Sequence, residues 1–260
     1  MQGAGRDAGS GFRISLEIGH DRIYEPYGLK LATTRSPWAV IAGLLALSAL
    51  ITPFAMAEIG QGNRSATADA REALAIGPGF ITALVLLLLG ALAATGEVRH
   101  RTAISTYLIT PRRGRILAAK LVAHATFGAV VAGLGVAIAF PIVLVMARSD
   151  GVQVATGTHL TGIAFAIVAA GALASVCGVA AGSILRHQTA AIIVILIWTL
   201  LVETFFGGFF PPVLPFGAIL AAIGMGADDA PGSLASFAVL TTWAAALSVA
   251  ASHFIKRDVT

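Results

Sequence analysis

The sequence predicts an all-α membrane protein with six transmembrane helices. Of its 260 residues, 57% are hydrophobic and only 12% are charged, which is more apolar surface than a soluble domain of this length can bury. The apolar residues form six runs, each long enough for the roughly 20 helical residues that cross a bilayer. These runs cover residues 37–57, 76–95, 117–147, 160–185, 189–206 and 234–255. We expect residues 37–260 to form one membrane domain.

Residues 1–36 form a polar tail before the first apolar run. We expect no cleaved signal peptide there, so the first apolar run should stay in the membrane. Apolar residues recur in segment 12–35 with a mixed period, which we interpret as a helix lying in the inner membrane interface. The alternative is a partly ordered tail. Ser36 and Pro37 then suit the first turn of the first span.

The positions of the basic residues predict the orientation of the spans. Six spans place both termini on one side, and 14 of the 17 lysine and arginine residues fall on that side. Only Arg64, Arg71 and Arg148 fall on the other. Because cytoplasmic loops are enriched in lysine and arginine, we predict a cell-membrane protein with both termini in the cytoplasm. The basic charge then fits anionic membrane lipids, and we expect no nucleic-acid partner.

The loop between the second and third runs, residues 96–120, carries six basic residues. Within it, Ile104, Tyr107 and Leu108 are spaced i, i+3, i+4, so they share one face of a short helix. Arg101 lies on the opposite, polar face, and Pro111 should end the helix. A small amphipathic helix on the cytoplasmic side of a membrane protein predicts a docking element for a partner.

Between the fifth and sixth runs, residues 207–226 are apolar but contain five glycines and three prolines, Pro211, Pro212 and Pro215. The prolines exclude one continuous helix. Irregular backbone at membrane depth is stable only where protein or trapped water satisfies it. We therefore predict a re-entrant helical hairpin that enters from the outer face. The alternative is a hydrophobic outer loop.

Glu203 is the ionisable residue that stands out within the apolar runs, because it lies past the middle of the fifth. A carboxylate at such depth is costly and usually faces protein or a water-filled cavity. One interpretation is a pathway or gating residue. The interpretation that we favour is structural, with Glu203 accepting hydrogen bonds from the broken hairpin that follows it.

Known catalytic and metal-binding patterns are missing from the sequence. It has no phosphate-binding G-x-x-x-x-G-K-[ST] loop, no G-x-S-x-G elbow and no His-x-x-x-His pair with a supporting carboxylate. Its single cysteine, Cys177, lies in an apolar run. We expect no catalytic residue, metal site or cofactor in this chain. Gly178 and Gly182, four residues apart after Ala174, predict a small-residue face for close helix packing.

Three segments together resemble the permeases of type-2 ABC exporters, in the small six-span form common in actinobacteria. They are residues 30–38, 95–102 and 110–120. The resemblance implies that the loop between spans two and three holds a coupling helix, and that the hairpin after Glu203 lies near an extracellular gate. It assigns the coupling region to Glu97, Arg101, Ile104, Tyr107, Leu108, Pro111 and Arg112. It assigns the gate or pathway to Glu203, Phe209, Pro211, Pro212 and Pro215. Arg101 departs from the family pattern, in which glycine is frequent at this position.

The resemblance implies the membrane-spanning half of an ATP-driven exporter. Its expected partners are a second permease, either a copy of this chain or a homologue, and two ATPase subunits that bind ATP and Mg²⁺. Drugs, peptides, lipids and polysaccharides all remain candidate substrates. The alternative is a proton- or ion-coupled secondary transporter that uses Glu203. A lack of paired broken helices in corresponding halves of the sequence argues against that alternative. A membrane-embedded enzyme ranks third.

Overall fold

The computed structural model describes residues 35–59, 70, 72–99, 113–149, 158–206, 213–225 and 233–257. Within these ranges the protein is helical and has no strand, so the predicted all-α class is confirmed. Six of its helical segments are long and apolar enough to cross a membrane, which makes the chain a multi-pass membrane protein. They agree with the predicted runs to within four residues at each end. They are Trp38–Glu58, Glu72–Gly96, Gly114–Arg148, Leu160–Leu185, Gln188–Phe206 and Leu234–Ile255.

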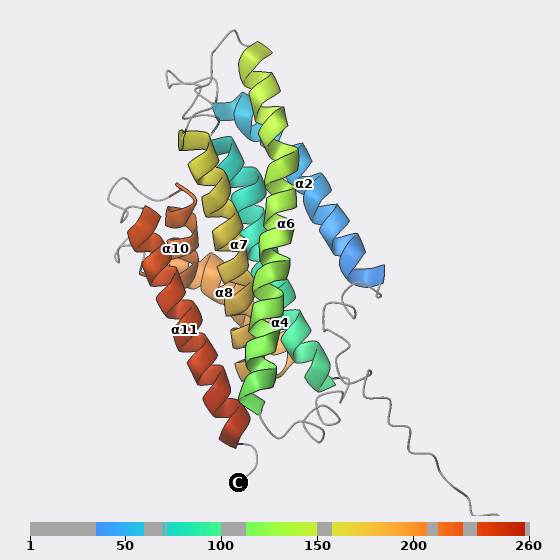
Figure 1. Cartoon of the computed structure of the whole chain (residues 1–260), viewed down its shortest axis with the longest axis vertical. Coiled ribbons are helices and arrows are strands. Elements are labelled where there is room, and N and C mark those ends of the chain that lie inside the picture. Colours follow the sequence, from blue (N-terminus) through green and yellow to red (C-terminus); the bar gives the residue numbers. More distant parts are fainter. Residues whose placement is uncertain are drawn as a thin grey trace, which may run out of the picture.

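The long helices run alternately up and down, which places Arg35 and Arg257 towards the same end of the bundle (Figure 1). We call this the terminal end. The elements are α2 (Arg35–Ile59), η2 (Ala75–Ile81), α4 (Thr82–Arg99), α6 (Arg113–Ser149), α7 (Thr158–Leu185), α8 (Gln188–Ile197), η3 (Trp198–Val202), α9 (Glu203–Phe206), α10 (Pro215–Ala222) and α11 (Ser233–Arg257). Residues 12–34 of the predicted interfacial helix lie outside the described part of the chain.

The centre of the bundle is α7, which packs against α4, α6 and α11. Glycines allow this close approach. A Cβ atom at Gly182 would lie 2.5 Å from the carbonyl oxygen of Ala91, and one at Gly178 would collide with the carbonyl group of Leu87. Gly128 of α6 likewise faces the backbone of α7 at Gly171. The predicted small-residue packing face is therefore confirmed, with α4 as its partner.

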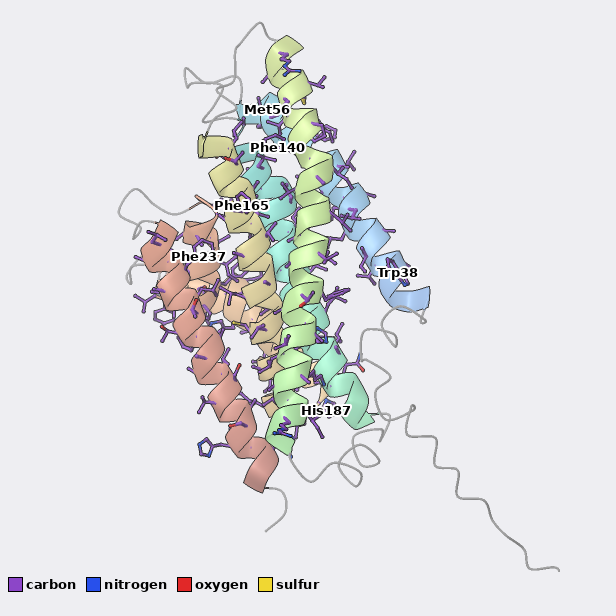
Figure 2. All side chains as sticks on the ribbon, viewed as in Figure 1. Trp38, Met56, Phe140, Phe165, His187 and Phe237 are labelled. Atoms are coloured by element: carbon purple, nitrogen blue, oxygen red, sulfur yellow. The ribbon has the colours of Figure 1, made fainter. Side chains whose placement is uncertain are left out.

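Large apolar side chains cover the outside of the bundle, as expected for a surface that faces lipid. Trp38 on α2 is 55% exposed and Phe165 on α7 is 77% exposed, and Figure 2 shows Trp38 at the outer edge of the bundle. Among the few buried polar side chains, Thr52, Thr95 and Thr199 bond to a carbonyl of their own span, whereas Ser48, Thr82, His124 and Ser175 each have a buried polar atom without a hydrogen-bond partner in the described part of the chain. Thr52, for example, donates its hydroxyl to the carbonyl oxygen of Ser48 at 2.7 Å.

Two spans contain π-helical turns that the sequence did not lead us to expect. Near the start of the second span lies η2, which contains Gly77, Pro78 and Gly79, and the proline has no N–H for the usual helical ladder. The fifth span widens at η3, near its end. One of these turns lies at the start of its span and the other near the end of its span, so the two do not occupy corresponding positions in the two halves of the chain.

The turn between α7 and α8 contains only Arg186 and His187. Arg186 has a φ of 55°, in the left-handed region that favours glycine. Its backbone N–H donates to the carbonyl oxygen of Gly182 at 2.9 Å. Its guanidinium donates to the carbonyl oxygen of Phe254, in the last turns of α11, at 2.9 Å. The side chain of Arg186 thus joins the α7–α8 turn to the end of α11.

Candidate functional site

The candidate site is centred on Glu203, the first residue of α9. The π-helical turn just before it sets its position, because the N–H of Glu203 bonds to the carbonyl oxygen of Trp198, five residues earlier. The side chain is only 7% exposed. A carboxylate so buried within a membrane span needs hydrogen-bond donors from the protein.

Those donors come from the N-terminus of α10. The N–H of Phe216 donates to Oε1 of Glu203 at 3.0 Å, and the N–H of Gly217 donates to Oε2 at 2.5 Å. Pro215, at the first helical position, has no N–H, and Ala218 starts the internal ladder by donating to the carbonyl oxygen of Leu214 at 2.8 Å. Glu203 therefore satisfies the two N–H groups that a helix start leaves unpaired, and its negative charge suits the positive end of the helix.

This geometry confirms the favoured interpretation of Glu203, in which the residue accepts hydrogen bonds from the chain segment after the fifth span. The capping acts between separate elements, since 13 and 14 residues separate Glu203 from its donors. No side chain of α10 itself, or of its N-cap residue Leu214, takes this role. A role for Glu203 in a gate or pathway stays a prediction.

Two indoles reinforce the attachment of α10. Trp243 of α11 donates its Nε1–H to the carbonyl oxygen of Val213, just before α10, at 2.6 Å. The side chain of Trp198, at the start of the preceding π-helical turn, interacts favourably with the carboxylate of Glu203. On the opposite side, the ring of Phe216 meets Phe80 of η2 edge-on at 5.7 Å between centroids. The start of α10 is thus attached to the second, fifth and sixth spans.

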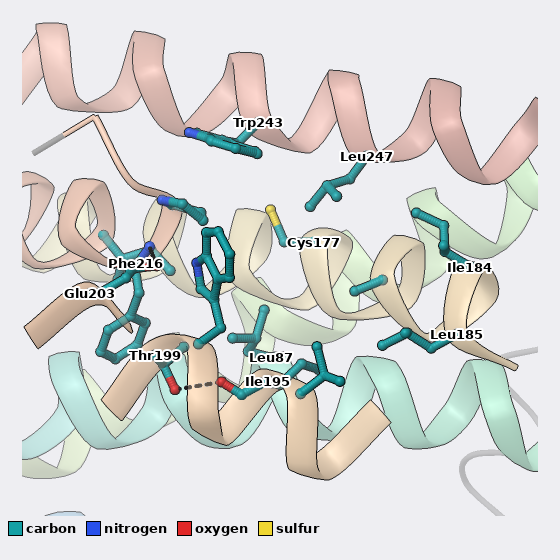
Figure 3. Close-up of a pocket in the computed structure, with 15 residues that line it drawn as sticks. Leu87, Cys177, Ile184, Leu185, Ile195, Thr199, Glu203, Phe216, Trp243 and Leu247 are labelled. Atoms are coloured by element: carbon teal, nitrogen blue, oxygen red, sulfur yellow. Dashed lines mark hydrogen bonds between the residues drawn. The ribbon is translucent and has the colours of Figure 1, made fainter. Parts of the chain in front are cut away.

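A cavity of about 270 Å³ lies beside this attachment. Its walls come from α4, α7, α8, η3, α10 and α11, and Glu203 and Trp243 lie towards one end of it (Figure 3). Cys177, on α7, contributes to the wall opposite α11. Apart from these groups and Thr199, the lining is aliphatic or aromatic. The cavity is therefore apolar, with its polar groups confined to one end.

The structure brings together only part of the predicted gate or pathway. Glu203 and Pro215 lie next to each other, since Pro215 begins the helix that Glu203 caps. Phe209, Pro211 and Pro212 lie outside the described residues. The described part of the hairpin is a single helix, α10, which packs against α11, α7 and η2. Its short length of eight residues agrees with the prediction that this segment does not cross the membrane.

The predicted coupling residues lie almost wholly outside the described ranges. Glu97 belongs to the last turn of α4, at the end of that helix away from η2. The others, Arg101, Ile104, Tyr107, Leu108, Pro111 and Arg112, fall between α4 and α6 in the part that the structure does not describe. Glu97 therefore lies at the end of α4 away from η2, whereas α10, which Pro215 begins and Glu203 caps, packs against η2 at the other end of the second span.

Sequence reasoning missed the link between Trp198 and Glu203. In an α-helix, residues five apart point about 140° away from each other, so the pair had no shared face in the expected regular helix. The π-helical turn changes this spacing and allows the two side chains to meet. Trp243 was missed for a different reason, because its partner is a backbone carbonyl 30 residues away.

The fold defines a six-span helical membrane protein with a capped short helix beside an apolar cavity. No protein-family model matches the chain, and a comparison with curated proteins gives no match. Within the described residues, no group of three or more histidine, cysteine, aspartate or glutamate side chains is placed to hold a metal ion.

Proposed function

We propose that this chain is the permease subunit of an ATP-driven exporter of the type-2 ABC class. It would work in the cell membrane, with both termini in the cytoplasm, and would pair with a second permease and two ATPase subunits that bind ATP and Mg²⁺. The observation that carries the proposal is the basic, amphipathic segment between spans two and three, with its resemblance to a coupling helix. The exported substrate would be a drug, peptide, lipid or polysaccharide.

The packing of the bundle suits the transmission of force from that segment. Residues 100–112 connect α4 to α6, and both helices pack tightly on α7. At these contacts backbone meets backbone: a Cβ at Gly90 would lie 2.5 Å from the carbonyl oxygen of Ser175, and one at Gly128 would lie 2.6 Å from that of Gly171. Close-packed helices of this kind move as a unit. A displacement of the coupling segment would therefore reach the centre of the bundle.

The hydrogen bonds of Glu203 favour this proposal over ion-coupled transport. A residue that couples protons must exchange them with water during the cycle. Both oxygens of Glu203 instead accept backbone N–H groups, and the loss of either bond would leave the start of α10 unsatisfied. Transport that depends on ATP and not on a proton gradient, measured in vesicles with the assembled complex, would separate the two mechanisms.

The docking of the ATPase can be tested at the apolar face of the predicted coupling helix. In the double variant Tyr107→Ala with Leu108→Ala, we expect the permease to insert normally but to lose its ATPase subunit on purification. Each large side chain contributes roughly 1.5–3 kcal/mol when fully buried at a contact. Pull-down of the ATPase from native membranes measures the effect. Ser105→Ala, on the polar face, serves as control, and undiminished co-purification by the double variant would argue against a coupling helix.

The orientation can be tested by cysteine labelling. The background variant Cys177→Ala removes the only native cysteine. Single cysteines at Asp69 and Asp229 should then react with a membrane-impermeant maleimide in intact cells, because the distribution of basic residues places both outside. Cysteines at Ser105 and Thr260 should react only after the cells are opened. Labelling of the Ser105→Cys variant in intact cells would reverse the proposed orientation.

A further inference from the structure

We propose that the apolar cavity beside Glu203 binds one acyl chain of a membrane phospholipid. The cavity lies at membrane depth, since α4, α7, α8 and α11, which form its walls, are spans or parts of spans. The proposal concerns a site within a single copy of the chain, and it holds whether or not an ATPase docks elsewhere.

The chemistry of the lining selects an apolar ligand. Four lining side chains contain nitrogen or oxygen, and each is already engaged. Thr199 donates its hydroxyl to the carbonyl oxygen of Ile195 at 2.8 Å, and Trp243 donates to Val213. Glu203 accepts from α10, and Trp198 interacts with the carboxylate of Glu203. A polar ligand would have to displace one of these bonds and leave a buried group unpaired, so the lining favours hydrocarbon.

The size and opening of the cavity suit a chain that enters from the bilayer. A dry apolar cavity of about 150 Å³ is enough to bind benzene, and this cavity measures about 270 Å³. Its floor includes Cys177 and Ile195, which are 2% and 6% exposed, whereas Val194 and Trp198 at its rim are 45% and 39% exposed. The rim residues lie on the fifth span, and α11 forms the wall across the cavity from α8 (Figure 3). The opening therefore faces the hydrocarbon.

A phospholipid chain is the occupant to which these features point. The bilayer supplies hydrocarbon chains in large excess at the open side, and water finds no free hydrogen-bond partner inside. The headgroup has no polar partner in the cavity either, so it should stay outside while the chain enters. An occupied cavity also restores the dispersion contacts that its walls would otherwise lack.

The experiment uses the full-length protein in phosphatidylcholine vesicles in which a fraction of the acyl chains carries a diazirine. After illumination, mass spectrometry maps the adducts. We expect adducts on Cys177 and Ile195, which annular lipid around the protein cannot reach. Ala181→Phe places a ring in the cavity from α7 and should lower the Cys177 adduct at least about fivefold, since close packing excludes the chain. Ala245→Phe, on the exposed face of α11, should leave the adduct unchanged.

Adducts confined to exposed residues such as Phe165 and Leu234, with none on Cys177, would overturn the proposal. A Cys177 adduct that persists at full yield in Ala181→Phe would also overturn it. If Ala181→Phe does not give a monodisperse protein, Leu247→Trp fills the same cavity from α11 and must reduce the adduct in the same way. The adduct map of the wild-type protein alone therefore shows whether an acyl chain reaches Cys177 in the cavity.

Discussion

Gly178→Ala should leave little correctly folded protein, whereas Gly162→Ala in the same helix should fold normally. A Cβ at Gly178 would collide with the carbonyl group of Leu87, and backbone atoms cannot move aside as a side chain can. The helices α4 and α7 would have to separate, and overpacking of this kind typically costs about 1–3 kcal/mol, occasionally more. Thermal unfolding and size-exclusion profiles in detergent measure the effect.

Gly162 is a matched control because it also belongs to α7, and a Cβ there would meet nothing within 4 Å. Both substitutions remove a glycine from a helix and gain the same intrinsic helix propensity, about 1 kcal/mol. Any difference between them therefore reports the contact with α4. Equal stability of the two variants would contradict the view that the backbone approach at Gly178 holds the bundle together.

Glu203→Leu should strongly destabilise the protein, and Glu203→Gln should have an intermediate effect. Leucine leaves the N–H groups of Phe216 and Gly217 without an acceptor, at a cost of roughly 1–3 kcal/mol for each buried donor. Glutamine keeps one acceptor oxygen but turns an NH₂ donor towards the second N–H. The melting temperature should therefore be highest for the wild type, lower for Glu203→Gln and lowest for Glu203→Leu.

The same variants separate a structural role from a transport role. Thr204→Leu, at the exposed neighbouring position, provides the control for added apolar bulk at this depth. If Glu203 couples protons or binds a cationic substrate, Glu203→Gln should melt at the wild-type temperature and assemble normally but not transport. That result would show that the capping bonds are not the main role of this carboxylate.

The spans and the role of Glu203 could be predicted from sequence because both follow from the cost of polar groups in hydrocarbon. Six apolar runs mark the spans, and a lone carboxylate near three prolines indicates a hydrogen-bonding need and the segment that meets it. The Gly178 and Gly182 pair was also informative, since small residues four apart share one helix face.

Other features depend on tertiary contacts, which produce no periodic pattern in the sequence. The π-helical turn at Trp198–Val202 has no proline or glycine to mark it. The turn at Ala75–Ile81 does contain Pro78, yet Pro53 and Pro141 lie inside helices that remain α-helical. Proline alone therefore does not distinguish a widened turn from a tolerated one. The cavity draws its walls from α4, α7, α8, η3, α10 and α11, so no single stretch of sequence encodes it.

The two-residue turn at Arg186 links helices that form walls of the cavity. A left-handed backbone costs a non-glycine residue about 1–2 kcal/mol, and glycine would avoid that cost but lose the guanidinium that holds Phe254. Arginine thus connects the α7–α8 turn to α11 at the terminal end. Farther along the bundle, Glu203 and Trp243 hold α10 between the fifth and sixth spans. The helices around the cavity are therefore connected twice by hydrogen bonds, once at the Arg186 turn and once through α10.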